Sequence, residues 1–261
     1  MNKKLANKIS YYKSLKALKY PVAKPLFYDI FVRPFNREKA LEISRRKPAK
    51  DIALRDFGLT FSKDSLVTEM FVERDYLKYE EFIPKKNDIL VDVGAQFGDY
   101  AILCNKYYGA KVFAFEPLSN NIRIIKENLT LNSVMENFNF YPVALGRSNQ
   151  KIQVAYNSDM MNANGVGKKQ LTEVRTLDSY KLNPDILKID VEGFEVDVLQ
   201  GAVETINKTH PKIIIETHTQ KLKNEVIAFL SERKYSLKYE GRAIENHDKN
   251  MDLIQNLFFE Y

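Results

Sequence analysis

Acidic side chains end two apolar runs of this sequence, and small residues follow the first of them. The run ILVDV contains Asp92 and leads into GAQFG, with glycines at Gly94 and Gly98. The run VFAF ends at Glu116. A carboxylate at the end of a strand can accept hydrogen bonds from hydroxyl or ammonium groups, and glycine lets a ligand lie close to the backbone. These residues predict a ligand-binding turn.

The spacing of this turn bears on the kind of ligand. A pyrophosphate-binding turn favours G-x-G-x-x-G, whose second glycine lets the backbone approach the phosphates. Gln96 occupies that position here, so a dinucleotide is disfavoured. Gly94 would let the methionine part of a sulfonium cofactor lie against the main chain, and Asp92 would act on its ammonium group. Glu116 is placed to bind ribose hydroxyls, which NAD and S-adenosylmethionine share, so it favours a nucleoside without choosing between them.

A second group of polar residues follows two later apolar runs. The stretch ILKIDVEG places Asp190 and Glu192 on one side of an extended strand, because side chains alternate. The stretch PKIIIETH does the same for Glu216 and His218. The carboxyl ends of parallel strands face one ligand crevice. We therefore expect these four side chains to converge where a methyl donor would present its carbon.

Two kinds of chemistry are open to this group. His218 can accept the proton of an acceptor hydroxyl, with a carboxylate orienting the imidazole. Alternatively, Asp190, Glu192 and His218 can hold a divalent cation that lowers the pKa of the hydroxyl. We favour the base and predict no metal, because the ligands are few and mixed. Glu195 and Asp197, which come next, are interpreted as charges at a helix start, where the helix dipole favours acids.

Hydrophobic periodicity predicts the elements that position these residues. Strands are expected at residues 89–93, 112–116, 138–144, 186–191, 212–217, 235–240 and 253–260. Helices are expected at 98–108, 119–131, 194–207 and 219–233. This alternation predicts an α/β fold with a doubly wound, mostly parallel sheet covered on both faces. The polar segment 157–170 is interpreted as a mobile substrate loop.

Charge is distributed unevenly along the chain. Residues 1–50 contain 14 Lys+Arg and 3 Asp+Glu, a net charge of +11, whereas residues 51–261 contain 26 and 31, a net charge of −5. Residues 3–19 have apolar side chains at helical spacing with lysines between them, which predicts a basic amphipathic helix. Such a helix either packs on its own domain or contacts anionic lipid, nucleic acid or another acidic partner.

Composition limits the class of protein and its compartment. The single cysteine, Cys104, excludes an intrachain disulfide and falls in a predicted helix, where a buried structural thiol is expected. No apolar run is long enough to span a bilayer, and lysines interrupt every apolar stretch before residue 27. We expect a cytoplasmic protein with possible peripheral contact at the inner membrane face. Residues 51–80 are expected to form short strands and turns, so we divide the chain into a basic N-terminal extension, 1–80, and a catalytic domain, 81–261.

Six stretches of residues 89–218 resemble FkbM-type methyltransferases, which use S-adenosylmethionine. They are VDVGAQFGDYA, VFAFEPLSNNIRIIKENLTLN, PVALG, TLDSY, ILKIDVEGFEVDVLQGA and PKIIIETH, in the order found in that family. The range that contains them, residues 89–218, is about half of the chain. The resemblance implies a Rossmann-like class I methyltransferase sheet of seven strands, the last of them antiparallel.

The resemblance also implies a set of cofactor-binding residues, which comprises Asp92, Gly94, Gln96, Gly98, Glu116, Asn121, Val143 and Ala144. The first four would line the amino-acid end of S-adenosylmethionine. Glu116 would bind the ribose, Asn121 would brace the turn after it, and the backbone of residues 143–144 would lie near the adenine. Asp190 and Glu192 would face the transfer site. Many members of the family carry Asn at the position of Gln96.

Together these features lead us to expect an O-methyltransferase that acts on a hydroxyl of a glycan or another small molecule. Transfer to a base amine usually relies on an Asx-Pro-Pro-aromatic turn after the fourth strand, where this chain has DVEG, so nucleic acid is not the expected partner. There are two alternatives. One is an RNA methyltransferase, and the other is a non-catalytic nucleoside-binding or scaffold protein that docks through the basic arm. The oligomeric state is left open.

Overall fold

A computed structural model describes residues 11–36, 39–40, 42–65, 67–134, 136–157, 160–161, 167–241 and 254–261. The chain divides into two compact units, residues 1–78 and 79–261, which are described separately. Among the helices of the described residues, none is long and apolar enough to cross a membrane.

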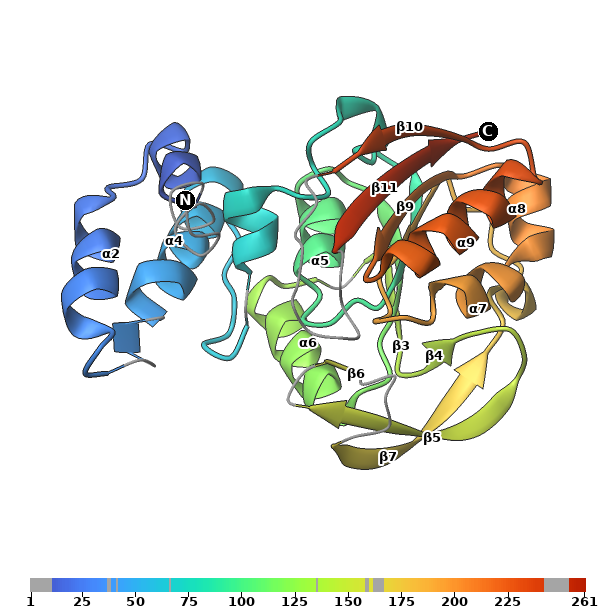
Figure 1. The fold of residues 1–261 in the computed structure, drawn as a ribbon, viewed down its shortest axis with the longest axis horizontal. Coiled ribbons are helices and arrows are strands. Elements are labelled where there is room, and N and C mark those ends of the chain that lie inside the picture. Colours follow the sequence, from blue (N-terminus) through green and yellow to red (C-terminus); the bar gives the residue numbers. More distant parts are fainter. Residues whose placement is uncertain are drawn as a thin grey trace. The chain divides into compact units, whose positions relative to one another are not determined.

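The larger unit is built on a seven-stranded sheet (Figure 1). Its strands are β1 (Ile89–Val93), β2 (Lys111–Phe115), β3 (Phe138–Tyr141), β8 (Ile186–Ile189), β9 (Lys212–Thr217), β10 (Ser236–Glu240) and β11 (Gln255–Glu260). Their order in the sheet is β10-β11-β9-β8-β1-β2-β3. All neighbouring pairs from β9 to β3 are parallel, whereas β11 runs antiparallel to both β9 and β10. The predicted doubly wound, mostly parallel sheet is therefore confirmed.

Buried apolar side chains explain why these runs form central strands. All four residues of β8 are buried, as are four of the five residues of β1. Strands covered on both faces need apolar side chains in both directions, and such runs read as continuous rather than alternating. The antiparallel edge strand β10 alternates instead between exposed and half-buried residues. The central strands β8, β1 and β2 therefore form a rigid base for the residues at their carboxyl ends.

Five helices connect and cover the sheet. They are α5 (Asp99–Lys106), α6 (Ser119–Leu131), α7 (Glu195–Gln200), α8 (Val203–Thr209) and α9 (Gln220–Ser231). The predicted single helix at 194–207 is in fact two, and the chain between them passes close to another loop. A β-carbon at Gly201 would lie 2.0 Å from the carbonyl oxygen of Gly146. Cys104 is buried in α5 as expected.

A second sheet of four strands was not predicted. It comprises β4 (Ala144–Leu145), β5 (Gln150–Asn157), β6 (Met160–Met161) and β7 (Lys168–Arg175), in the order β4-β7-β5-β6. Part of the segment interpreted as a loop thus forms strands, and 158–159 and 162–166 lie outside the described residues. The predicted strand 138–144 ends at Tyr141, and the chain enters this second sheet at Ala144.

The smaller unit is helical in the residues described, and the expectation of short strands in 51–80 is wrong. Its elements are α2 (Ala23–Phe27), η1 (Tyr28–Val32), η2 (Glu42–Arg46), α4 (Lys47–Phe57) and η3 (Glu69–Glu73), with a further helical segment at 11–17. A 3₁₀ turn, η4 (Glu80–Phe82), begins the larger unit, and another, η5 (Leu177–Tyr180), precedes β8. Residues 3–10 of the predicted basic helix lie outside the described residues. The misassigned segment contains β-branched and aromatic residues, whose local preference was overridden by packing within the helical unit.

Candidate active site

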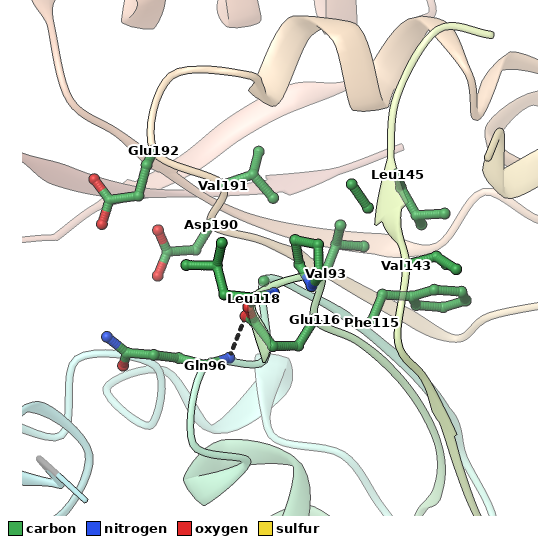
Figure 2. Close-up of a pocket in the computed structure, with 13 residues that line it drawn as sticks. Val93, Gln96, Phe115, Glu116, Leu118, Val143, Leu145, Asp190, Val191 and Glu192 are labelled. Atoms are coloured by element: carbon green, nitrogen blue, oxygen red, sulfur yellow. Dashed lines mark hydrogen bonds between the residues drawn. The ribbon is translucent and has the colours of Figure 1, made fainter. Parts of the chain in front are cut away.

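A pocket lies at the carboxyl ends of β1, β2 and β8 in the larger unit, where a doubly wound sheet binds its ligands (Figure 2). Its lining comprises Val93, Gly94, Gln96, Phe115, Glu116, Pro117, Leu118, Val143, Ala144, Leu145, Asp190, Val191 and Glu192. Seven predicted site residues are in this set, from both the cofactor group and the catalytic group. The pocket therefore joins the two polar groups that the sequence placed on separate strands.

Gly94 is required by a close approach between β1 and β8. Its φ is +79°, and a β-carbon there would lie 1.7 Å from the carbonyl oxygen of Asp190. Any side chain would have to displace the backbone that carries Asp190, a predicted catalytic residue. Gly94 thus brings the turn after β1 against the end of β8, in addition to lining the pocket.

Glu116 is held in place by three neutral donors. Its carboxylate accepts hydrogen bonds from the backbone N–H of Gln96 at 3.0 Å, the backbone N–H of Leu118 at 2.8 Å and the side-chain amide of Asn121 at 3.3 Å. Figure 2 shows the bond from Gln96. Burial raises the pKa of Glu116 to about 7, although the three donors oppose this effect. A carboxylate fixed in this way, with lone pairs left over, fits the two hydroxyls of a ribose.

Apolar side chains form the part of the pocket near Glu116. Phe115 stacks on Tyr141 with ring centroids 4.9 Å apart, and Val143 and Leu118 also line the space. An aromatic and aliphatic wall beside a carboxylate suits a nucleoside, which has a flat base and a polar sugar. The predicted positions of Val143 and Ala144 agree with this arrangement, since both line the pocket.

Three predicted cofactor residues lie behind the pocket rather than in its lining. Asn121 is 1% exposed and braces Glu116. Gly98 has a φ of +75°, and a β-carbon there would lie 2.5 Å from the side chain of Ile125, so this glycine permits packing against α6. Asp92 is also 1% exposed. These residues thus support the lining from behind, and the roles predicted for Asp92, directly or through water, and for Gly98 at the amino-acid end of the cofactor stay predictions.

Asp92 forms a buried ion pair that the sequence analysis missed. The Lys188 ammonium lies 3.2 Å from Asp92 Oδ1 and 3.7 Å from Asp190 Oδ2, and it donates a hydrogen bond to the carbonyl oxygen of Gly94 at 2.9 Å. Both side chains of the Asp92–Lys188 pair are less than 5% exposed. Lys188 therefore ties β8 to the turn after β1. A lysine inside an otherwise apolar strand was the signal that could have revealed it.

The four predicted catalytic residues do converge, and His218 lies at their centre. Its Nε2 atom is 3.3 Å from Glu216 Oε1, 3.4 Å from Glu192 Oε2 and 4.0 Å from Asp190 Oδ1. Its Nδ1 atom is 3.6 Å from Glu195 Oε1. We call these five residues the His218 cluster. Asp190 and Glu192 line the pocket, whereas His218 and Glu216 are not in its lining.

The interpretation of Glu195 as a simple helix-start charge is wrong. Glu195 is fully buried, and its carboxylate accepts hydrogen bonds from the backbone N–H groups of Val191 at 3.2 Å and Gly193 at 3.1 Å. It therefore holds the turn that carries Glu192 while it contacts His218. Asp197 keeps the surface position expected of it, where it pairs with Arg147.

The surrounding carboxylates keep a proton on His218. Burial by itself would lower the pKa of this imidazole, but contacts with Glu195 and Glu216 and the charges of Glu192 and Asp190 outweigh burial and raise the pKa to about 12. A general base must be unprotonated to accept a proton. The raised pKa of His218 opposes the predicted role of this residue as that base and favours the imidazolium form.

The alternative of a bound cation has a geometric basis within the described residues. One ligand atom from each of Asp190, Glu192 and His218 lies within 4.8 Å of the others. His218 would have to lose its proton to serve as a ligand. The imidazolium already supplies positive charge to these carboxylates, so the arrangement is explained without an ion.

The fold and the pocket define a class of protein, the S-adenosylmethionine-dependent methyltransferases with a doubly wound sheet. The family described as the methyltransferase FkbM domain matches residues 92–237, more than half of the chain. This protein belongs to that family. The residues present fit the methyl donor, because a braced carboxylate and an apolar wall occupy one end of the pocket and an acidic cluster occupies the other.

Three individual proteins are similar to this chain. Hexuronic acid methyltransferase AglP from Haloferax volcanii is 29% identical over 175 residues, which cover 63% of this chain and 70% of that protein. The crystal structure of a methyltransferase from Pyrococcus furiosus has a TM-score of 0.51 at 17% identity and covers 87% of this chain and 98% of that one, which shows the shared fold. An FkbM methyltransferase from Methylobacillus flagellatus is 20% identical, with a TM-score of 0.48, over 66% of this chain and 43% of that one.

Proposed function

We propose that this methyltransferase transfers a methyl group to a hydroxyl oxygen of a glycan. The observation that carries the proposal is a single pocket with Glu116 at one end and the paired carboxylates of Asp190 and Glu192 at the other. The relative AglP is named for a hexuronic acid, which is a sugar, and this supports a glycan acceptor.

Residues at the β2 end would hold and orient the methyl donor. S-adenosylmethionine, when bound, supplies a methyl carbon that is already activated by its sulfonium. Glu116 would accept hydrogen bonds from the ribose hydroxyls, and Phe115 and Val143 would contact the adenine. Orientation of this kind can be worth about 7–11 kcal/mol of the barrier in favourable cases.

The His218 cluster would remove the proton that transfer leaves on the acceptor oxygen. Glu192 is the best-placed acceptor of this proton, because it lines the pocket and burial raises its pKa above the usual range for a glutamate. A base with a pKa nearer to neutrality accepts a hydroxyl proton more readily than an ordinary carboxylate. His218, 3.4 Å away, would stabilise the ionised form of Glu192 before the transfer.

The negative charge of Asp190 and Glu192 in the pocket also favours a neutral acceptor group. A hexuronic acid offers both hydroxyls and a carboxylate. A carboxylate needs no base, but in this pocket it would meet the like charges of Asp190 and Glu192. A hydroxyl has no charge and needs the base that the cluster offers. We therefore propose an ether product rather than an ester.

Methyl-labelled S-adenosylmethionine, incubated with the purified protein and separated glycan, glycolipid and RNA fractions, tests the proposal. We expect label in a glycan-containing fraction, resistant to mild alkali as a methyl ether is. Label released by mild alkali would indicate an ester and contradict the proposed acceptor group. Label confined to RNA, or no transfer to any fraction, would overturn the proposal.

A further inference from the structure

The smaller unit carries an exposed apolar stripe along α2, η1 and the turn that follows. It consists of Leu26, Phe27, Ile30, Phe31 and Phe35, which are 39–90% exposed. The rings of Phe27 and Phe31 contact each other, with centroids 5.2 Å apart, so the stripe is continuous in its middle. Single exposed apolar residues are ordinary, but a contiguous group of large ones marks an interaction surface.

The polar side of the same segment faces inward, which reverses the usual arrangement of a surface helix. Asp29 is only 6% exposed and accepts hydrogen bonds from the Tyr12 hydroxyl at 3.1 Å and from Arg33 at 2.9 Å. A helix that merely covered a core would bury its apolar residues and expose this aspartate. Turning the segment over would break the hydrogen bond from Tyr12, which lies on the preceding helical segment, to Asp29. The buried contacts of Asp29 therefore keep Phe27 and Phe31 directed outward.

Positive charge accompanies the stripe. Residues 1–78 contain 18 Lys+Arg and 9 Asp+Glu, a net charge of +9, whereas the rest of the chain has a net charge of −3. Lys13, Lys16 and Lys19 are exposed on the helical segment and turn that precede α2. Large exposed apolar side chains in a unit with an excess of lysine are typical of segments that lie in the interface of an anionic bilayer.

We propose that this stripe inserts into the headgroup region of a membrane that contains anionic lipids. We assign a lipid surface because it offers two kinds of contact and this unit can make both. The phenylalanines would contact the boundary of the acyl chains, and the lysines would contact the lipid phosphates. The proposal keeps the lysines of the basic helix expected from sequence, residues 3–19, and adds the apolar stripe, which the sequence did not indicate. It does not depend on the identity of the methyl acceptor.

Co-sedimentation of the full chain with vesicles tests this surface. Two vesicle types are used, pure phosphatidylcholine and phosphatidylcholine with roughly one third phosphatidylglycerol. We expect binding to the anionic vesicles, weakened but not abolished by added salt. The double substitution Phe31→Gln, Phe35→Gln keeps the net charge and is expected to lower the partition coefficient by about tenfold or more.

A matched control separates insertion from general effects. Leu131→Gln removes an exposed apolar residue of α6, which is 46% exposed, and is expected to change binding by less than about twofold. Thermal unfolding shows whether the variants keep the fold. Unchanged vesicle binding by the double variant, or no binding by the parent chain, would overturn the proposal. A dimer in sedimentation velocity that the double variant loses would also overturn it, because a second copy would then cover the stripe.

Discussion

The two ends of the pocket hold buried carboxylates by different means. At one end Glu116 is bound by three neutral N–H donors, which fix its position. At the other end Glu192 faces the cationic His218 together with other acidic residues. Neutral donors suit a carboxylate that must accept hydrogen bonds from a ligand, whereas a nearby cation suits one that exchanges a proton. In the proposed function the same residue type would serve binding at one end and chemistry at the other.

The largest effect is expected from Glu192→Gln. This change keeps the shape of the side chain but removes the proposed proton acceptor, so turnover should fall by about 10²–10⁴-fold. Affinity for S-adenosylmethionine, measured by calorimetry, should change by less than about threefold, because the donor is bound mainly at the Glu116 end. Equal losses in turnover and cofactor affinity would contradict the assignment of cofactor binding to the Glu116 end and of proton transfer to the Glu192 end.

His218→Gln should destabilise the fold. Removal of one partner from a buried charge network typically costs about 3–5 kcal/mol, since the remaining charges lose their compensation. The folded-state pKa of His218 is about 12, above its ordinary value, so its contribution is full at pH 6 and declines as the pH rises toward 12. Denaturant unfolding at pH 6 and pH 9 should show the larger loss at pH 6. His210→Gln, at an exposed histidine, is the control, and an equal loss in both variants would contradict the prediction.

Glu116→Gln should act on binding rather than on chemistry. Hydrogen bonds to a charged group contribute about 1.5–3 kcal/mol each, so the affinity for S-adenosylmethionine should fall by about 10- to 100-fold. Turnover at saturating cofactor should stay within about threefold of the parent. The matched control is Glu127→Gln, an exposed glutamate of α6. Retained affinity in Glu116→Gln would remove this residue from the ribose site.

The pH dependence of cofactor binding should report on the same glutamate. With a pKa of about 7, Glu116 is mostly ionised at pH 8 and mostly protonated at pH 6. Protonation removes an acceptor, so affinity should be up to about tenfold weaker at pH 6 than at pH 8. Calorimetry at the two values checks this, and the Glu116→Gln variant should show little of the change. A parent affinity that is equal at both values would contradict the prediction.

The smallest effect is expected from a chelator. Because His218 already compensates the carboxylates around it, removal of divalent cations should change turnover by less than about twofold. The assay is methyl transfer before and after treatment with EDTA, with magnesium or manganese added back. A large loss that these ions restore would instead assign Asp190, Glu192 and His218 to a cation site.

The sequence predicted most of the larger unit and little of the smaller one. Hydrophobic patterns predicted all seven strands of the main sheet, and the central parallel strands were the clearest because they must be apolar on both faces. The four strands of the second sheet were missed. Its two long strands, β5 and β7, contain many polar residues, and they pair with each other although other residues separate them in the sequence. The helical unit was misread in residues 51–80 because short segments carry ambiguous periodicity.

The sequence by itself determined the positions of the chemical groups along the chain. Acidic residues at strand ends and one well-placed histidine were enough to predict that Asp190, Glu192, Glu216 and His218 would meet. Only the tertiary structure decided what their surroundings do to them. Whether His218 is a neutral base or a cation depends on the charged residues that the ends of β8 and β9 and the start of α7 bring around it. The sequence did not indicate that Glu195 would be one of these residues. The protonation state of a side chain depends on its burial and on its distance from other charges, and the sequence alone gives neither quantity.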